Sequence, residues 1–327
     1  MSTYQGKKSQ KKGKPMPHHL KDKKKYFWPT FLTTPVFHRA SRRSWRGIFP
    51  MGICEYYKQL RRDKRTKFEH ELSIVAIMKN EGPYLKEWLD FHILVGVTKF
   101  YLYDNESTDN TYKILKPYIE SGIVDYTYYP GRAMQKPAYH DAVKKHADKT
   151  RYMALIDLDE FLVPVKHKTL PQFLKTLPRF SQLIVSWVNY GSNGHKKKPK
   201  GLVIENYTKH GKDHYGVKSI INPRLITYLG NPHYNFVAGP TIDENGKYIG
   251  GVNQERNPTT INKIRCNHYQ TKSYEEYFAR CSKGSAATGA LLKTFGKDIE
   301  TNFRSFDKNE IYDNIMNKYI KKLKNTK

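Results

Sequence analysis

Cysteine and long hydrophobic runs are scarce in this sequence. The three cysteines, Cys54, Cys266 and Cys281, are far apart and form no CxxC pair, which argues against a disulfide framework and against a structural zinc site. The longest apolar runs are only a few residues long, so no helix is expected to span a bilayer. No apolar stretch follows the basic N-terminus, so a signal peptide is not expected either. We therefore expect a protein of the reducing cytoplasm.

Acidic residues are in the minority, with 30 Asp and Glu against 58 Lys and Arg, and the net charge is +28 over 327 residues. Residues 1–70 hold 19 basic and 4 acidic residues, which is 19 − 4 = +15 of that charge. Residues 1–25 are rich in lysine and lack a periodic apolar face, which predicts a disordered basic tail. Residues 26–70 form a basic aromatic extension. It suits an anionic membrane surface or a nucleic acid, or simple packing on the domain that follows.

The next part of the chain alternates predicted strands with predicted helices. Short runs rich in β-branched and aromatic residues predict strands over 72–78, 99–103, 123–129 and 152–156. Apolar residues at helical spacing predict helices over 84–95, 111–121 and 136–149. Four strands joined by helices indicate an α/β protein whose parallel sheet has helices on both faces.

Polar residues follow three of these strands, at the point where each strand ends. They are Asn80 and Glu81 after the first strand, Asp104 after the second, and Asp157 and Asp159 after the fourth. Ligands of such sheets bind outside the carboxyl ends of the strands. We therefore expect these side chains to converge on one edge of the sheet.

The acidic pair is the strongest chemical signal. In an extended chain, residues two apart share a face, so Asp157 and Asp159, with Glu160 beside them, repel each other unless a cation neutralises them. Oxygen ligands of this kind suit Mg²⁺ or Mn²⁺, which complete their coordination with water and phosphate oxygens. The alternative is an exposed acidic turn that caps the following helix. The position directly after a hydrophobic strand favours the metal site.

Seven ordered motifs carry a resemblance to a known family. They are KNE (79–81), YLKEWL (84–89) with His92, FYLYDNESTD (100–109), DLDEFL (157–162), WVNYGSNGH (187–195), KSI (218–220) and NHYQTKSYEE (267–276). This series resembles glycosyltransferase family 92 and its bacterial relatives. The resemblance implies a GT-A-type, Rossmann-like fold with a mixed, mainly parallel sheet. We expect this domain to cover residues 71–285, with a basic helical tail over 286–327.

The resemblance also implies an activity. It predicts an inverting, metal-dependent hexosyltransferase that uses Mn²⁺ or Mg²⁺ and a nucleotide-sugar donor, a UDP-hexose such as UDP-galactose. The acceptor is expected to be a glycan or a lipid-linked saccharide of surface polysaccharide or lipopolysaccharide synthesis. The basic N-terminus lies outside the resemblance, and its composition leaves attachment to the inner face of the membrane as one expectation beside simple packing on the domain.

The family pattern assigns a role to each matching polar residue. It gives Asp157 and Asp159 to the metal and the diphosphate, with His268 as a further metal ligand or, alternatively, a buried core histidine. It places Asn80, Glu81 and Asp104 around the nucleoside, although Asp104 also suits a turn within its own loop. Lys272 is expected to meet a phosphate oxygen, or else only to precede a helix that starts at Ser273.

The acceptor side is harder to read. Trp187 and His195 flank a polar loop, expected to be flexible, and are candidates for contact with a sugar. Lysines 196–198 and Lys200 add charge that suits an anionic acceptor, or else form a solvated face. An inverting transferase needs a base for the acceptor hydroxyl. The sequence leaves several candidates for that base: Glu205, Asp243, Glu244 and Glu255.

Two other classes of function compete with the enzyme. One is a GT-A-fold module without activity, against which the intact acidic pair argues. The other is a nucleic-acid-binding protein that acts through the basic N-terminus. No zinc-finger spacing, RNA-binding signature or leucine heptad supports the second, so nucleic acid is not the expected partner.

Overall fold

The computed structural model describes residues 67–249, 260–283 and 298–326 of the chain. The predicted tail over 1–25 and nearly all of the extension over 26–70 lie outside these ranges, as does Glu255. Within them, no helix combines the length and the apolar character needed to cross a membrane.

The first half of the domain is the predicted alternation of strands and helices. The parallel strands, in the spatial order β3-β2-β1-β4, are β1 (His70–Met78), β2 (Lys99–Asp104), β3 (Val124–Tyr128) and β4 (Thr150–Leu155). The connecting helices are α3 (Gly82–Leu94), α4 (Thr111–Glu120) and α5 (Gln135–His146). Gly122, at φ 76°, follows α4 where the sequence predicts its end, because glycine adopts positive φ without a steric penalty.

The sheet then continues, in the order β4-β8-β6-β12-β5, into strands that come later in the chain. These are β5 (Glu160–Pro164), β6 (Gln182–Asn189), β8 (Val217–Ile221) and β12 (Ile264–His268), and the short β11 (Thr241–Ile242) also pairs with β6. β8 runs antiparallel to both β4 and β6, while β12 is parallel to β6 and antiparallel to β5. The nine-stranded sheet is therefore mixed and mainly parallel, which confirms the expected fold class.

Smaller elements surround the sheet. The helices are α6 (Leu170–Leu174), α7 (Val203–Asn206), α8 (Tyr274–Lys283), α9 (Ile299–Phe306) and α10 (Asn317–Lys324), with a 3₁₀ turn, η2, at Pro223–Leu225. The remaining strands form two pairs, β9 (Ile226–Tyr228) with β10 (Phe236–Val237), and β7 (Lys209–His210) with β13 (Ile311–Tyr312).

Helices cover both faces of the sheet, as the alternating side chains of β1 require. Ile74 and Ala76 pack in the core that contains α3, whereas Val75 and Ile77 pack on the other face with residues of α5. Successive residues of a strand point to opposite faces, so a strand that is buried on both faces has no polar side. This explains why the run over 72–78 is almost continuously apolar.

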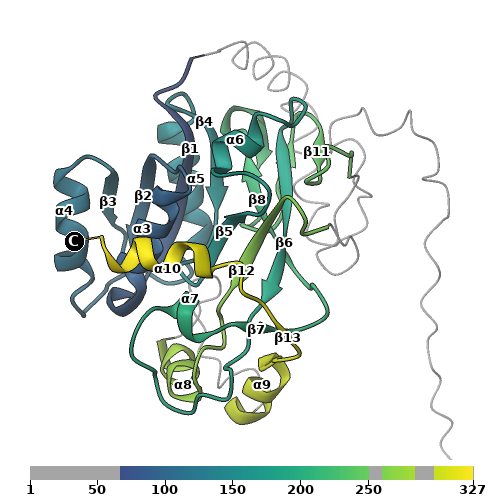
Figure 1. Ribbon diagram of the computed structural model, residues 1–327. Helices are drawn as coiled ribbons and strands as arrows, with labels where there is room; N and C mark the ends of the chain where they lie inside the picture. The colour runs from purple at the N-terminus through teal and green to yellow at the C-terminus, as the bar shows by residue number, and fades with distance from the viewer. Residues whose placement is uncertain (1–66, 250–259, 284–297, 327) are drawn as a thin grey trace, which may run out of the picture.

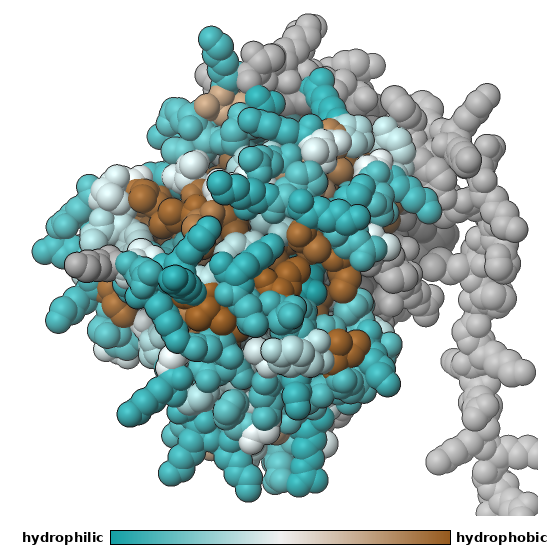
Figure 2. Space-filling view, viewed as in Figure 1, coloured by the Kyte–Doolittle hydropathy of each residue, from teal (hydrophilic) through white to brown (hydrophobic). Residues whose placement is uncertain are grey.

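The C-terminal segment packs on the domain. In Figure 1 the yellow helix α10 runs across α3 and α7, and Tyr319 and Leu323 of α10 are buried in the core with α3. The predicted domain boundary at 285 is therefore crossed by core contacts. The surrounding surface is mainly hydrophilic on the face shown in Figure 2, with a few hydrophobic patches.

Candidate active site

The register of three neighbouring strands brings polar side chains together. His268, the last residue of β12, pairs with Glu160 at the start of β5 on one side and with Asn189 at the end of β6 on the other. The turn that contains Asp159 lies next to this row, and the backbone carbonyl of Asp159 accepts a hydrogen bond of 2.8 Å from Tyr269 N–H. Leu158 is buried in the core, as expected for the residue between the two aspartates. The acidic turn is thus held at the carboxyl end of β4.

Asp159, Glu160 and His268 form a cluster of possible metal ligands, since one ligand atom of each lies within 4.8 Å of the others. His268 Nε2 lies 3.7 Å from Asp159 Oδ1 and 3.8 Å from Glu160 Oε1. Glu160 is fully buried, and its Oε1 has no hydrogen-bond partner. A buried carboxylate oxygen without a partner is costly, so the donor set fits a cation that would contact it.

Hydrogen bonds fix the orientation of the imidazole. His268 Nδ1 lies 3.0 Å from Asn189 Oδ1, and Asn189 Nδ2 donates in turn to the carbonyl of Tyr215 at 3.1 Å. With its amide oriented in this way, Asn189 accepts the Nδ1 proton, so the Nε2 lone pair faces the two carboxylates. A histidine ligand supported by such a partner is the usual arrangement in metal sites.

Asp157 has different partners from Asp159. Lys218 Nζ donates to Asp157 Oδ2 at 2.6 Å and lies 3.3 Å from Glu160 Oε2. Gln135 Nε2 and Tyr139 Oη, both from α5, donate to Asp157 Oδ1 at 3.2 and 3.5 Å. The structure therefore gathers Glu160, and not the predicted Asp157, with Asp159 and His268. Asp157 is instead bound by a buried lysine.

The pKa values follow from burial and from neighbouring charges. Burial raises the pKa of Glu160 well above its ordinary value and lowers the pKa of His268 to about 3, so the imidazole is neutral. Burial also opposes ionisation of Asp159, but nearby cations, among them Arg280 with Nε 3.6 Å from Asp159 Oδ2, hold its pKa below the usual range. Burial opposes the charge of Lys218 as well, yet Asp157 and Glu160 raise its pKa.

The residues predicted around the nucleoside hold the loop after β2. Asn80 Oδ1 accepts a hydrogen bond of 2.7 Å from the backbone N–H of Thr108. Asp104 accepts hydrogen bonds from Ser107 N–H at 2.9 Å and from Tyr126 Oη at 2.8 Å. The turn role that the sequence left open for Asp104 is therefore present.

Lys272 lies close to two of the predicted residues. Its side chain is buried, burial lowers its pKa, and Asp159 and Glu81 are the two acidic groups that most oppose this effect. Both carboxylates thus favour the charged form of Lys272. This is a suitable place for a group that meets a phosphate.

Trp187 and His195 occupy different places. The Trp187 ring lies 4.3 Å from the His268 ring, next to the cluster, whereas His195 packs edge-on against Tyr207 at 5.8 Å. The polar loop over 191–195 is not the free, flexible loop that was expected. The C-terminal segment holds it, because Asp307 accepts hydrogen bonds from the backbone N–H and the hydroxyl of Ser192 at 2.6 and 3.0 Å.

The structure places two of the proposed bases, Asp243 and Glu244, far from the cluster. β11 pairs with the first residues of β6, while the cluster lies at the last, about 20 Å away at 3.3 Å per residue. Asp243 and Glu244 follow β11. Asp243 closes a turn through the N–H of Lys247, and Glu244 accepts backbone N–H groups such as that of Ile264. Glu205 forms an ion pair of 2.5 Å with Lys324. Asp243 and Glu244 therefore lie far from the cluster, the role of Glu205 stays a prediction, and Glu255 lies outside the described residues.

Several residues of the site had no role predicted from the sequence. These are Glu160, which was noted only as a neighbour of the pair, and Lys218, Gln135, Tyr139, Asn189 and Arg280. The one local signal was a lysine inside the apolar run of β8, since a lysine is rarely buried without a partner.

Comparison with known proteins gives a consistent result. The model of glycosyltransferase family 92 matches residues 75–319. A glycosyltransferase family 92 protein of Oryza sativa subsp. japonica is 26% identical over 245 residues, 73% of this chain and 39% of the relative. One from Arabidopsis thaliana is 24% identical over 213 residues, 61% and 35% of the two chains. The chain thus spans well under half the length of these two relatives.

One further relative and two solved structures are also similar. Galactan beta-1,4-galactosyltransferase GALS3 of Arabidopsis thaliana is 24% identical over 270 residues, 71% of this chain and 52% of the relative. S. aureus TarS 1–349 in complex with UDP is 17% identical. The match covers 40% of this chain and 38% of the TarS chain, with a TM-score of 0.29. Glucosyl-3-phosphoglycerate synthase from Mycobacterium tuberculosis, in complex with Mn²⁺ and UDP, is 20% identical. The match covers 36% of this chain and 44% of the synthase chain, with a TM-score of 0.24. Such TM-scores carry no argument about the site.

Proposed function

The chain belongs to glycosyltransferase family 92, and we propose that it transfers a hexose from a nucleotide sugar to a saccharide acceptor with the help of a divalent metal. The observation that carries the proposal is the cluster of Asp159, Glu160 and His268, with one buried carboxylate oxygen that has no partner. The family supplies the class of reaction, and the cluster supplies a place for the metal.

We propose Asp159, Glu160 and His268 as the residues that would hold this metal. Two carboxylate oxygens and a neutral imidazole suit Mn²⁺ better than Mg²⁺, which takes oxygen ligands almost alone. When bound, the metal would offset negative charge on the diphosphate of the donor and of the leaving nucleoside diphosphate.

The protein supplies further charges for the same anion. Lys218 is a buried cation that Asp157 and Glu160 keep charged. Lys272 is a second buried lysine, and Asp159 and Glu81 favour its charged form. Ammonium groups fixed in a site of low dielectric stabilise a phosphate leaving group more strongly than the same groups in water. The arrangement therefore suits departure of a nucleoside diphosphate.

The finer parts of the proposal rest on the family and on the relatives. We propose a UDP-hexose as donor, and the galactosyltransferase among the relatives favours UDP-galactose. We propose inversion at the anomeric carbon, and surface polysaccharide or lipopolysaccharide synthesis as the pathway. Attachment to the inner face of an anionic membrane through the basic N-terminal residues belongs to the same proposal.

Calorimetric titration with UDP, in the presence and absence of Mn²⁺, tests the metal site. We expect the parent protein to bind UDP with micromolar affinity only when Mn²⁺ is present. In Asp159→Asn the affinity should fall at least about a hundredfold, because the loss of one charged metal ligand removes about 3 kcal/mol of binding free energy. Asp243→Asn is the matched control, because the same change at the far end of β6 leaves the site intact. Equal binding by Asp159→Asn and the parent protein would refute the site assignment.

A further inference from the structure

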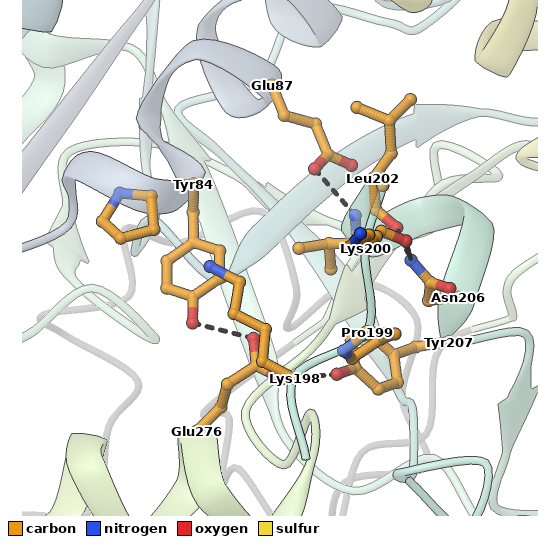
Figure 3. A pocket seen from close by; sticks show the side chains of 12 residues that line it. Tyr84, Glu87, Lys198, Pro199, Lys200, Leu202, Asn206, Tyr207 and Glu276 are labelled. Carbon is orange, nitrogen blue, oxygen red and sulfur yellow. Dashed lines mark hydrogen bonds between the residues drawn. The ribbon is translucent and has the colours of Figure 1, made fainter.

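The described residues form a recess that none of the three cluster residues lines. It has a volume of about 390 Å³ and lies between the start of α3, the segment over 198–207 and the start of α8 (Figure 3). Such a volume is enough for a small ligand. Its main polar lining residues are Tyr84, Glu87, Lys198, Lys200, Tyr207 and Glu276. Lys198 and Lys200 belong to the run of lysines that the sequence offered for an anionic acceptor.

Two ammonium groups meet at one aromatic ring of this recess. Lys198 Nζ lies 4.4 Å and Lys272 Nζ 4.6 Å from the centre of the Tyr84 ring. Lys272 is only 7% exposed, and its ammonium group donates to the carbonyl of Tyr269 at 3.1 Å. Within the described ranges, neither lysine forms a salt bridge. Of the two, Lys198 lines the recess, and its exposed ammonium group can meet an anion there.

The carboxylates nearby are already engaged. Glu276 accepts hydrogen bonds from the hydroxyl groups of Tyr84 at 2.8 Å, of Tyr207 at 2.5 Å and of Ser273 at 2.6 Å. Glu87 accepts from the backbone N–H groups of residues 203 and 204, at 2.8 and 3.0 Å. In Figure 3 both carboxylates are turned to these partners, while the Lys198 side chain extends over the Tyr84 ring. These donors are neutral, and the two lining glutamates balance the two lining lysines in charge. Neither glutamate forms a salt bridge with Lys198 within the described ranges, so the ammonium group of Lys198 is left to meet another anion.

We infer that this recess binds a carboxylate or phosphate group of the acceptor saccharide through Lys198, whose ammonium group lies over the Tyr84 ring. Helix α8 connects the recess with the acidic turn, because Glu276 lines the recess and Arg280, one helical turn later, has its Nε 3.6 Å from Asp159 Oδ2. A group bound in the recess therefore lies near the proposed donor site. Assignment of this ligand as the acceptor rests on the proposed function, whereas the affinity for an anionic sugar does not.

Binding of small sugars to the full chain, without UDP or metal, tests the inference. The probes are D-glucuronic acid, D-glucose 6-phosphate and D-glucose, titrated by NMR at physiological salt. We expect at least one anionic sugar to bind at least about tenfold more tightly than glucose, and Lys198→Ala to remove most of that difference. Lys197→Ala is the matched control, since Lys197 is exposed in the same run of lysines but does not line the recess.

Each outcome decides a separate point. Tighter binding of glucuronic acid identifies a carboxylate site, and tighter binding of glucose 6-phosphate a phosphate site. The inference is overturned if glucose binds equally well, if no probe binds below about 20 mM, or if Lys197→Ala weakens binding as much as Lys198→Ala. If the protein does not bind UDP in the presence of Mn²⁺, the proposed donor site is refuted instead. The affinity of the recess for anionic sugars does not depend on that result.

Discussion

The buried ion pair between Arg265 and Asp313 gives a sharp prediction about the role of the C-terminal segment. Arg265 lies on β12, three residues before His268, and its side chain is 7% exposed. Its Nη2 donates to Asp313 Oδ2 and, at 2.9 Å, to the hydroxyl of Tyr190, which itself donates to Asp313 at 2.9 Å. Asp313→Ala removes the carboxylate and leaves a guanidinium group buried without its counter-charge. Such a loss destabilises a protein by about 3–5 kcal/mol.

Urea-induced unfolding, followed by circular dichroism, measures this cost as the change in the extrapolated free energy of unfolding. The control is Glu300→Ala, which breaks the ion pair between Glu300 and Arg304. In that pair the Glu300 side chain is 50% exposed and the Arg304 side chain 76% exposed. An exposed pair contributes less than about 1 kcal/mol. Asp313→Asn, which keeps a polar group of the same shape, is expected to fall between the two. If Asp313→Ala costs no more than Glu300→Ala, the C-terminal segment does not stabilise β12 in this way.

Three further predictions concern other parts of the chain. Burial raises the pKa of Glu87 to about 7, so the free energy of unfolding falls by up to about 3 kcal/mol as pH rises from about 4.5, the pKa in the unfolded chain, to 7. Urea unfolding measured across this pH range should show that Glu87→Gln removes this fall. An unchanged dependence of the free energy of unfolding on pH in Glu87→Gln would refute the prediction. Gly216→Ala would place a Cβ 2.0 Å from the Trp187 ring at φ +91°, so it should lower the melting temperature and shift tryptophan fluorescence. The control is Gly194→Ala, at φ +83° with open space around it, which should lower the free energy of unfolding by only about 1 kcal/mol. Equal losses of stability in the two variants would contradict the packing argument. Removal of residues 1–25 should leave UDP binding intact but weaken sedimentation with anionic vesicles at low salt, and unchanged sedimentation would rule out this tail as the anchor.

Local sequence pattern was enough to predict the first half of the sheet. The strands β1 to β4 and their helices alternate along the chain, and each carries its own periodicity, so that their existence and order follow from neighbouring residues alone. The order β4-β8-β6-β12-β5 is different. It depends on pairing between strands far apart in sequence, and local hydrophobicity does not encode those partners.

The same distinction explains the prediction of the site. Asp159 and His268 were named from their motifs, and the structure places them together. Glu160 could not be assigned as a possible ligand, because its proximity to His268 results from the antiparallel register of β5 and β12. Asp243 was a reasonable base by chain position alone, but the pairing of β11 with the first residues of β6 puts it at the wrong end of the sheet.

The C-terminal segment is physically part of the site that it follows in sequence. Asp307 binds the backbone N–H and hydroxyl of Ser192, and Asn309 Oδ1 accepts the N–H of Asn193 at 2.7 Å. A chain cut at 285 would leave these amides, and the guanidinium group of Arg265, without partners in the part of the chain that carries β6 and β12. These two strands end at the residues that orient and form the acidic cluster. Hence the contacts that hold the cluster in place extend beyond the motifs that identify it, in agreement with a family match that continues to residue 319.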